Sequence, residues 1–172
     1  MNLAKPHADV LAAHHRARRR LRLPKRCDDY VSKAVQGYAV HEAAHAVAFH
    51  EMGQPFKFVT VIPHKQNGGD VTLTPEQHAA FCKLRRLLQA RAILAAHTAQ
   101  LYMDPDHNFN MRDSDVRHVA RLFGGKIPPH VSASVAQYVV KPVVWSKIER
   151  VARWLLRRGT LYPDDVARLC KG

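Results

Sequence analysis

Five consecutive residues, His41-Glu42-Ala43-Ala44-His45, combine two imidazoles and a carboxylate at a spacing that suits metal chemistry. Residues four apart lie on the same face of an α-helix, so both imidazoles can reach one ion. Glu42 lies one step around that helix, where its carboxylate can hold a water molecule bound to the ion. This HExxH pattern predicts a Zn²⁺ site in which Glu42 is the catalytic general base.

The pattern has an alternative interpretation, because it fixes only three positions and the chain contains 12 histidines. A histidine-rich helix without a metal is that alternative. The surroundings favour the metal, since strong helix signals flank the motif and small side chains allow other elements to pack close to it. Those small residues are Ala43, Ala44, Ala46 and Ala48.

A catalytic zinc site needs a third protein ligand and keeps a fourth position for water. The extended pattern HExxHxxGxxH is excluded, because Ala48 and Glu51 stand at its glycine and final histidine positions. A glutamate ligand from a later helix typically stands in an ExxxD pattern. Neither Glu76 nor Glu149 has an aspartate four residues later, so neither fits that pattern. The third ligand is therefore expected among the aspartates that follow the second long helix, namely Asp104, Asp106, Asp113 and Asp115.

The elements that must position these residues follow from hydrophobic spacing and turn residues. Apolar residues recur at three to four residue steps from Asp28, which predicts a helix that stops at Gly53. Thr74-Pro75-Glu76-Gln77 is typical of a helix start with a capping box. Helices are expected over 28–52, 75–103, 112–123, 132–158 with a bend at Pro142, and 162–170.

Two short segments between the first two helices are typical of β-strands. Residues 55–63 alternate between apolar and polar side chains and are rich in β-branched residues. Residues 70–73 directly follow Gly68-Gly69, so a small hairpin is expected. The second strand either offers an unpaired edge to which an extended peptide could add or is an ordinary capped edge. The predicted fold class is mainly α with a small β-hairpin or sheet.

The order of these segments resembles the peptidase domain of the FtsH-type ATP-dependent zinc metalloproteases. YAVHEAAHAVAFHEMG is similar to that family's helix reading HEAGHA, and PFKFVTVIPHKQNGGDVTLTPE is similar to its following strand pair. LLQARAILAAHTAQLY resembles the helix carrying GRAAE, and SDVRHVARL resembles the helix opening SNDLERAT. WLLRRGTLYPDDVARLC resembles the closing LLEKGTLTGEEV, so the resemblance covers about residues 28–170.

The resemblance implies a zincin-like fold and a zinc-dependent metalloendopeptidase that acts on unfolded or flexible polypeptides. The aspartate of SNDLERAT is the family's third zinc ligand, so His41, His45 and Asp115 are the implied metal ligands and Glu42 the implied catalytic residue. The chain departs from the family pattern where the family has the Gly, Arg and Glu of GRAAE. The residues at those positions are Ala96, His97 and Gln100.

Positive charge is concentrated in the first part of the chain. Of a formal net charge of +13, residues 1–26 contribute eight basic side chains against one aspartate. The sequence therefore predicts a basic, flexible arm over 1–27 and a peptidase-like domain over 28–172. The arm is either a solvated tail or a contact for nucleic acid, which would release counterions on binding.

The sequence pattern also argues against a membrane span, a secretory signal and a disulfide framework. No uncharged stretch approaches the roughly 18 residues of a spanning helix, and the N-terminus lacks the apolar run of a secretory signal, so no membrane span and a cytoplasmic location are expected. Three cysteines without metal-type spacing predict reduced thiols.

The family carries an AAA+ ATPase with a GxxxxGK[ST] loop, and the printed sequence contains no such motif. A free-standing peptidase that acts on a polypeptide substrate is therefore expected. A separate ATPase is one partner that the sequence leaves open. Because the family's domains form hexamers, the resemblance also leaves open that this chain forms a homo-oligomer. The second hypothesis is a weakly active or inactive peptidase-fold protein that uses its basic arm to bind nucleic acid or a partner.

Overall fold

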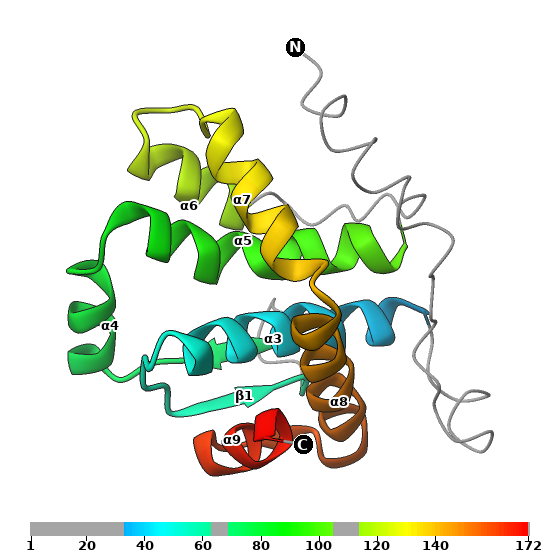
Figure 1. Cartoon of the computed structure of the whole chain (residues 1–172). Coiled ribbons are helices and arrows are strands. Elements are labelled where there is room, and N and C mark those ends of the chain that lie inside the picture. Colours follow the sequence, from blue (N-terminus) through cyan, green and yellow to red (C-terminus); the bar gives the residue numbers. More distant parts are fainter. Residues whose placement is uncertain (1–32, 63–68, 105–113, 172) are drawn as a thin grey trace.

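The computed structural model describes residues 33–62, 69–104 and 114–171 (Figure 1). The predicted basic arm and the expected helix start at Asp28 lie outside these ranges. The described part is mainly helical with one small antiparallel sheet, which confirms the predicted mainly α class. Within these ranges, no helix combines the length and the apolar character needed to cross a bilayer.

Helix α3 (Lys33–Glu51) carries the HExxH motif and runs through the middle of the molecule, between α5 and the sheet (Figure 1). Nearly every side chain from Ala39 to Phe49 is buried, as expected for a helix that neighbours cover on all sides. The helix ends where the sequence predicted. Gly53 follows it with a φ of 64°, a left-handed conformation that glycine adopts without steric strain.

The predicted hairpin is present, and a third strand extends it into a sheet. Strand β1 (Phe58–Thr60) pairs antiparallel with β2 (Asp70–Thr72) on one side and with β3 (Thr160–Leu161) on the other. The strand order is β2-β1-β3, so among the described residues β2 has a neighbour on one side only. The sequence did not predict β3, because two residues cannot show an alternating pattern.

The predicted helix over 75–103 is wrong as a single element. It forms α4 (Pro75–Cys82), which begins with the predicted capping box at Thr74, and α5 (Arg86–Met103). Between them, the buried Gln89 amide donates hydrogen bonds to the carbonyls of Cys82 and Leu84, at 3.2 and 2.7 Å. These bonds give partners to the last carbonyl of α4 and to one carbonyl in the turn that follows, so the chain can turn without a proline or glycine.

The predicted bent helix over 132–158 is also two helices, α7 (Pro129–Val139) and α8 (Pro142–Arg158). Pro142 is the first residue of α8, where its missing N–H removes no helical bond, so it starts a helix instead of bending one. The remaining helices, α6 (Ser114–Leu122) and α9 (Pro163–Lys171), match the expected segments closely.

Candidate metal centre

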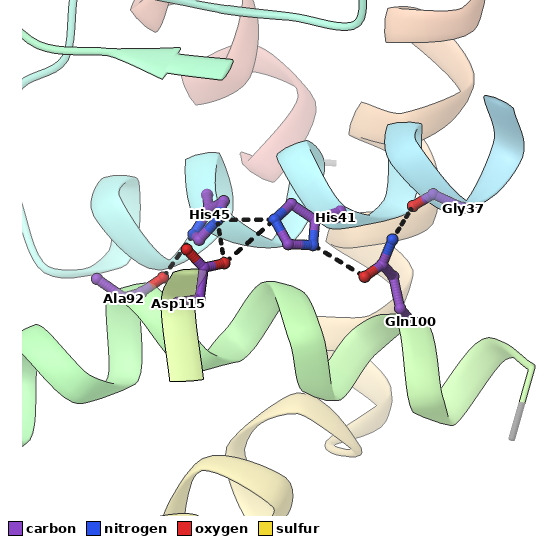
Figure 2. Close-up of polar contacts among 6 residues, drawn as sticks. All are labelled: Gly37, His41, His45, Ala92, Gln100 and Asp115. Carbon is purple, nitrogen blue, oxygen red and sulfur yellow. Dashed lines mark hydrogen bonds and ion pairs between the residues drawn. The ribbon is translucent and has the colours of Figure 1, made fainter. Parts of the chain in front are cut away.

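Two side chains from α3 and one from α6 meet at a single point (Figure 2). The Nε2 atoms of His41 and His45 lie 3.2 Å apart. Asp115 Oδ2 lies 3.3 Å from the first nitrogen and 3.4 Å from the second. The structure thus brings together the two histidines of the motif and one of the four aspartates considered as a third ligand.

Asp115 reaches this point because it lies in the first turn of α6, and α6 packs on α5 beside α3. The positive end of the helix dipole favours a carboxylate at that position. Asp104 instead follows the last residue of α5 and is not part of the cluster. Asp106 and Asp113 lie outside the described residues.

The second nitrogen of each ring is held by α5. His41 Nδ1 lies 3.0 Å from Gln100 Oε1, and His45 Nδ1 lies 2.8 Å from the carbonyl oxygen of Ala92. Both partners accept hydrogen bonds, so both Nδ1 atoms carry a proton and donate it. Each neutral ring therefore directs an unprotonated Nε2 toward the other ring and toward Asp115.

Two nitrogen lone pairs and a carboxylate oxygen at such short range repel one another unless a positive charge lies between them. The Oδ2 atom of Asp115 is buried and has no hydrogen-bond partner, so it also requires such a charge. Ligand atoms about 2.0–2.1 Å from a tetrahedral zinc ion are about 3.3–3.4 Å apart. The three measured separations, 3.2–3.4 Å, fit a small ion held by two nitrogens and one oxygen.

Without a metal, a proton takes the place of that positive charge. Burial opposes charge on both rings and lowers the pKa of His41 from its ordinary value of 6.5. For His45 the effect of burial is outweighed by the Asp115 carboxylate, which raises its pKa to about 9. Although burial also opposes ionisation of Asp115, its interactions with the two histidine rings hold the pKa of its carboxyl well below the usual range.

Glu42 is buried next to this cluster, at the side of the hairpin. Burial, assisted by the charges of Asp70 and Asp115 and opposed by that of His45, raises the pKa of Glu42 to about 7. Gly69, just before β2, lies against it. A Cβ at Gly69 would come within 2.7 Å of Glu42 Cγ and 2.8 Å of the Thr60 carbonyl oxygen, so only glycine fits there without a shift.

Two residues of this site carried no functional signal in the sequence. Gln100 appeared only as a departure from a family pattern, and Gly69 only as a turn residue. A clue to Gln100 is that it stands on a largely apolar helix face with buried neighbours such as Ala96 and Ala99, and is itself 1% exposed. A fully buried polar side chain needs partners, which His41 and Gly37 supply in the structure.

Comparison of the chain with protein-family models, with curated proteins and with solved structures found no match. The function proposed below therefore rests on the chemistry of the centre and on the sequence resemblance described above. That centre could hold a metal ion through two imidazole nitrogens and one carboxylate oxygen.

Proposed function

We propose that the chain is a zinc-dependent metallopeptidase of the FtsH type that hydrolyses peptide bonds in unfolded or flexible polypeptides. One observation carries the proposal. The lone pairs of His41 and His45, each oriented by a hydrogen bond at the opposite ring nitrogen, converge with Asp115 Oδ2 within 3.2–3.4 Å. Zinc suits this donor set and geometry better than the oxygen-preferring cations do.

In this proposal His41, His45 and Asp115 hold the ion, and Glu42 moves the proton. Bound zinc supplies a Lewis acid that acidifies water and polarises a carbonyl oxygen. Burial raises the pKa of Glu42 to about 7 in the metal-free chain, and the charge of a bound ion would favour its carboxylate, the form that accepts a proton. Glu42 can therefore accept a proton from water and later donate it to the leaving amine, the two roles a general acid–base needs.

The free edge of β2 supports a polypeptide substrate. Among the described residues β2 pairs only with β1, so backbone groups along its other side can bind an extended peptide as a further strand. Asp70 begins this strand directly after Gly69, which lies against Glu42. A peptide added at this edge would pass close to the proposed general base.

The metal assignment is tested by measuring the zinc content of the purified full-length chain. We expect about one zinc per polypeptide, removed by Asp115→Ala. Asp164→Ala is the matched control, because Asp164 also lies in the first turn of a helix but is exposed and far along the chain in α9. Zinc retained by the Asp115 variant would reject this ligand set.

The activity is tested by incubating the zinc-loaded chain with an unfolded, casein-like substrate, with and without a chelator. Glu42→Gln should keep its zinc and lose at least about a hundredfold in cleavage rate. Glu149→Gln replaces another buried glutamate, on α8, and should cleave like the wild type. Equal fragment yields from the wild type and Glu42→Gln would reject the peptidase and favour a non-catalytic role.

A further inference from the structure

We propose that Gln100 is a positioning residue that sets the metal-binding form of His41, by holding the ring proton on Nδ1 and aiming Nε2 at the ion. This inference rests on the metal centre of the proposed function. Gln100 lies on α5 beside His41 (Figure 2), and its side chain is almost completely buried. It does not touch the ion's position itself, so its effect acts through the histidine.

The orientation of the Gln100 amide follows from its second contact. Its Nε2 lies 3.1 Å from the carbonyl oxygen of Gly37, one turn before His41 on α3. A backbone carbonyl can only accept a hydrogen bond, so the amide NH₂ group must face Gly37. The amide oxygen then faces His41 Nδ1 at 3.0 Å and can only accept.

This polarity determines the state of the ring. A neutral imidazole carries its proton on either nitrogen, and only the unprotonated nitrogen binds a metal. Because Gln100 Oε1 cannot donate, His41 must place its proton on Nδ1 and leave Nε2 free. Every donor and acceptor is thus fixed in the chain of hydrogen bonds that links the Gly37 carbonyl, Gln100 and His41. This chain leaves the metal-binding lone pair on His41 Nε2.

Gln100 and Ala92 divide the same task between two ligands. Ala92 orients His45 through its backbone carbonyl, so no substitution of its side chain removes that acceptor. Gln100 orients His41 through its side chain, so that contact can be altered by mutation. Ala92 and Gln100 are two helical turns apart on α5, whereas the two histidines are one turn apart on α3. The Gln100 side chain spans the additional distance to His41.

The main test is zinc affinity measured by competition with a chromophoric chelator. Gln100→Leu should bind zinc about 10–100-fold more weakly than the wild type, the usual effect of losing a residue that orients a ligand. Gln89→Leu is the matched control, because Gln89 is also buried on α5 and also donates to backbone carbonyls, but contacts no histidine. It should stay within about twofold of the wild type. Wild-type affinity in a folded Gln100→Leu chain would overturn the inference.

Gln100→Glu provides a second test that does not depend on the folding of the leucine variant. A carboxylate still accepts from His41 Nδ1 but no longer donates to Gly37. Zinc affinity should therefore fall less than about threefold. A loss of tenfold or more in folded Gln100→Glu would show that the acceptor role does not explain the effect and would overturn the inference.

A spectroscopic measurement separates positioning from a general loss of stability. In the zinc-loaded wild type, the buried Nδ1 proton of His41 should give a slowly exchanging, ¹⁵N-coupled signal. The signal should persist in Gln89→Leu and Gln100→Glu and be lost in Gln100→Leu. Its persistence in Gln100→Leu would overturn the inference. If the wild type itself bound no zinc, the proposed function would fail, whereas equal binding by wild type and Gln100→Leu rejects the role of Gln100 alone.

Discussion

Helix α3 packs against two long helices of very different composition. On α5 the buried side chains are mostly alanines, such as Ala92, Ala96 and Ala99, together with the polar Gln100. On α8 they include large branched residues, of which Ile148 and Leu155 are completely buried. Ile93 and Leu94 are also buried on α5, so the difference is one of average size: the buried side chains of α5 are smaller than those of α8.

Because of this difference, the metal centre lies on the α5 side of α3, whereas much of the hydrophobic stabilisation comes from the α8 side. Alanine side chains allow the α5 backbone to approach closely enough for His45 to bond the Ala92 carbonyl. They also bury little apolar area, and burial stabilises by roughly 25 cal/mol per Å². The α8 side supplies larger buried surfaces, so the fold can include a cluster of histidines and carboxylates that contributes little hydrophobic stabilisation.

The largest expected effect on stability is a truncation on the α8 side. Leu155→Ala removes a completely buried side chain and should lower the free energy of unfolding by about 2–5 kcal/mol. Zinc affinity of the folded variant should remain within about twofold of the wild type, because Leu155 is not part of the centre. Urea unfolding and chelator competition measure the two quantities. Equal losses in both would contradict the separation of the two sides.

On the α5 side, the informative substitution enlarges a small buried side chain instead of truncating a large one. Ala96 lies one turn from both Ala92 and Gln100 on the same face, and is completely buried. Ala96→Leu should lower the free energy of unfolding by about 1–3 kcal/mol through overpacking. Unlike Leu155→Ala, it should also weaken zinc binding, since the added carbons enter the space next to the two histidines. A folded Ala96→Leu chain with unchanged zinc affinity would argue against close packing as the basis of the site.

In the chelator-treated protein, the free energy of unfolding should depend on pH because of His45, which faces α5. His45 has a pKa of about 9 in the folded chain against an ordinary 6.5, so its protonated form stabilises the fold. That contribution is complete below about pH 6.5 and is lost as the pH rises through about 9. Urea unfolding at pH 7.5 and 9 should show the loss in the wild type and in Leu155→Ala. In His45→Gln the difference should be much smaller, and an equally large difference there would assign the effect to another group.

The smallest effect is expected at an exposed ion pair on the surface of α9. Arg168 Nη2 lies 2.7 Å from Asp165 Oδ1, but its side chain is 68% exposed. Exposed ion pairs contribute little because water and salt screen them, so Arg168→Ala should change the free energy of unfolding by less than about 1 kcal/mol. A larger loss, measured by urea unfolding at 0.15 M salt, would place an unrecognised contact on α9.

Most helices could be predicted because their signals are local. Gly53 ends α3 and the Thr74 capping box begins α4, and both features depend on residues within one turn. The break between α4 and α5 could not be predicted, because the Gln89 side chain that bonds the carbonyls there meets them only once the chain has turned. Strand β3 likewise exists through its pairing with β1, a partner far away in the sequence.

The same distinction applies to the centre. The sequence alone determined that His41 and His45 share a helix face, because helical periodicity sets that relation within five residues. It restricted the third partner to a few aspartates, and the resemblance selected among them. Only the tertiary structure decided that Asp115 reaches both rings and that Gln100 holds one of them, because these contacts depend on how α5 and α6 pack against α3. Such packing results from many weak contacts spread over the chain, which no short motif records.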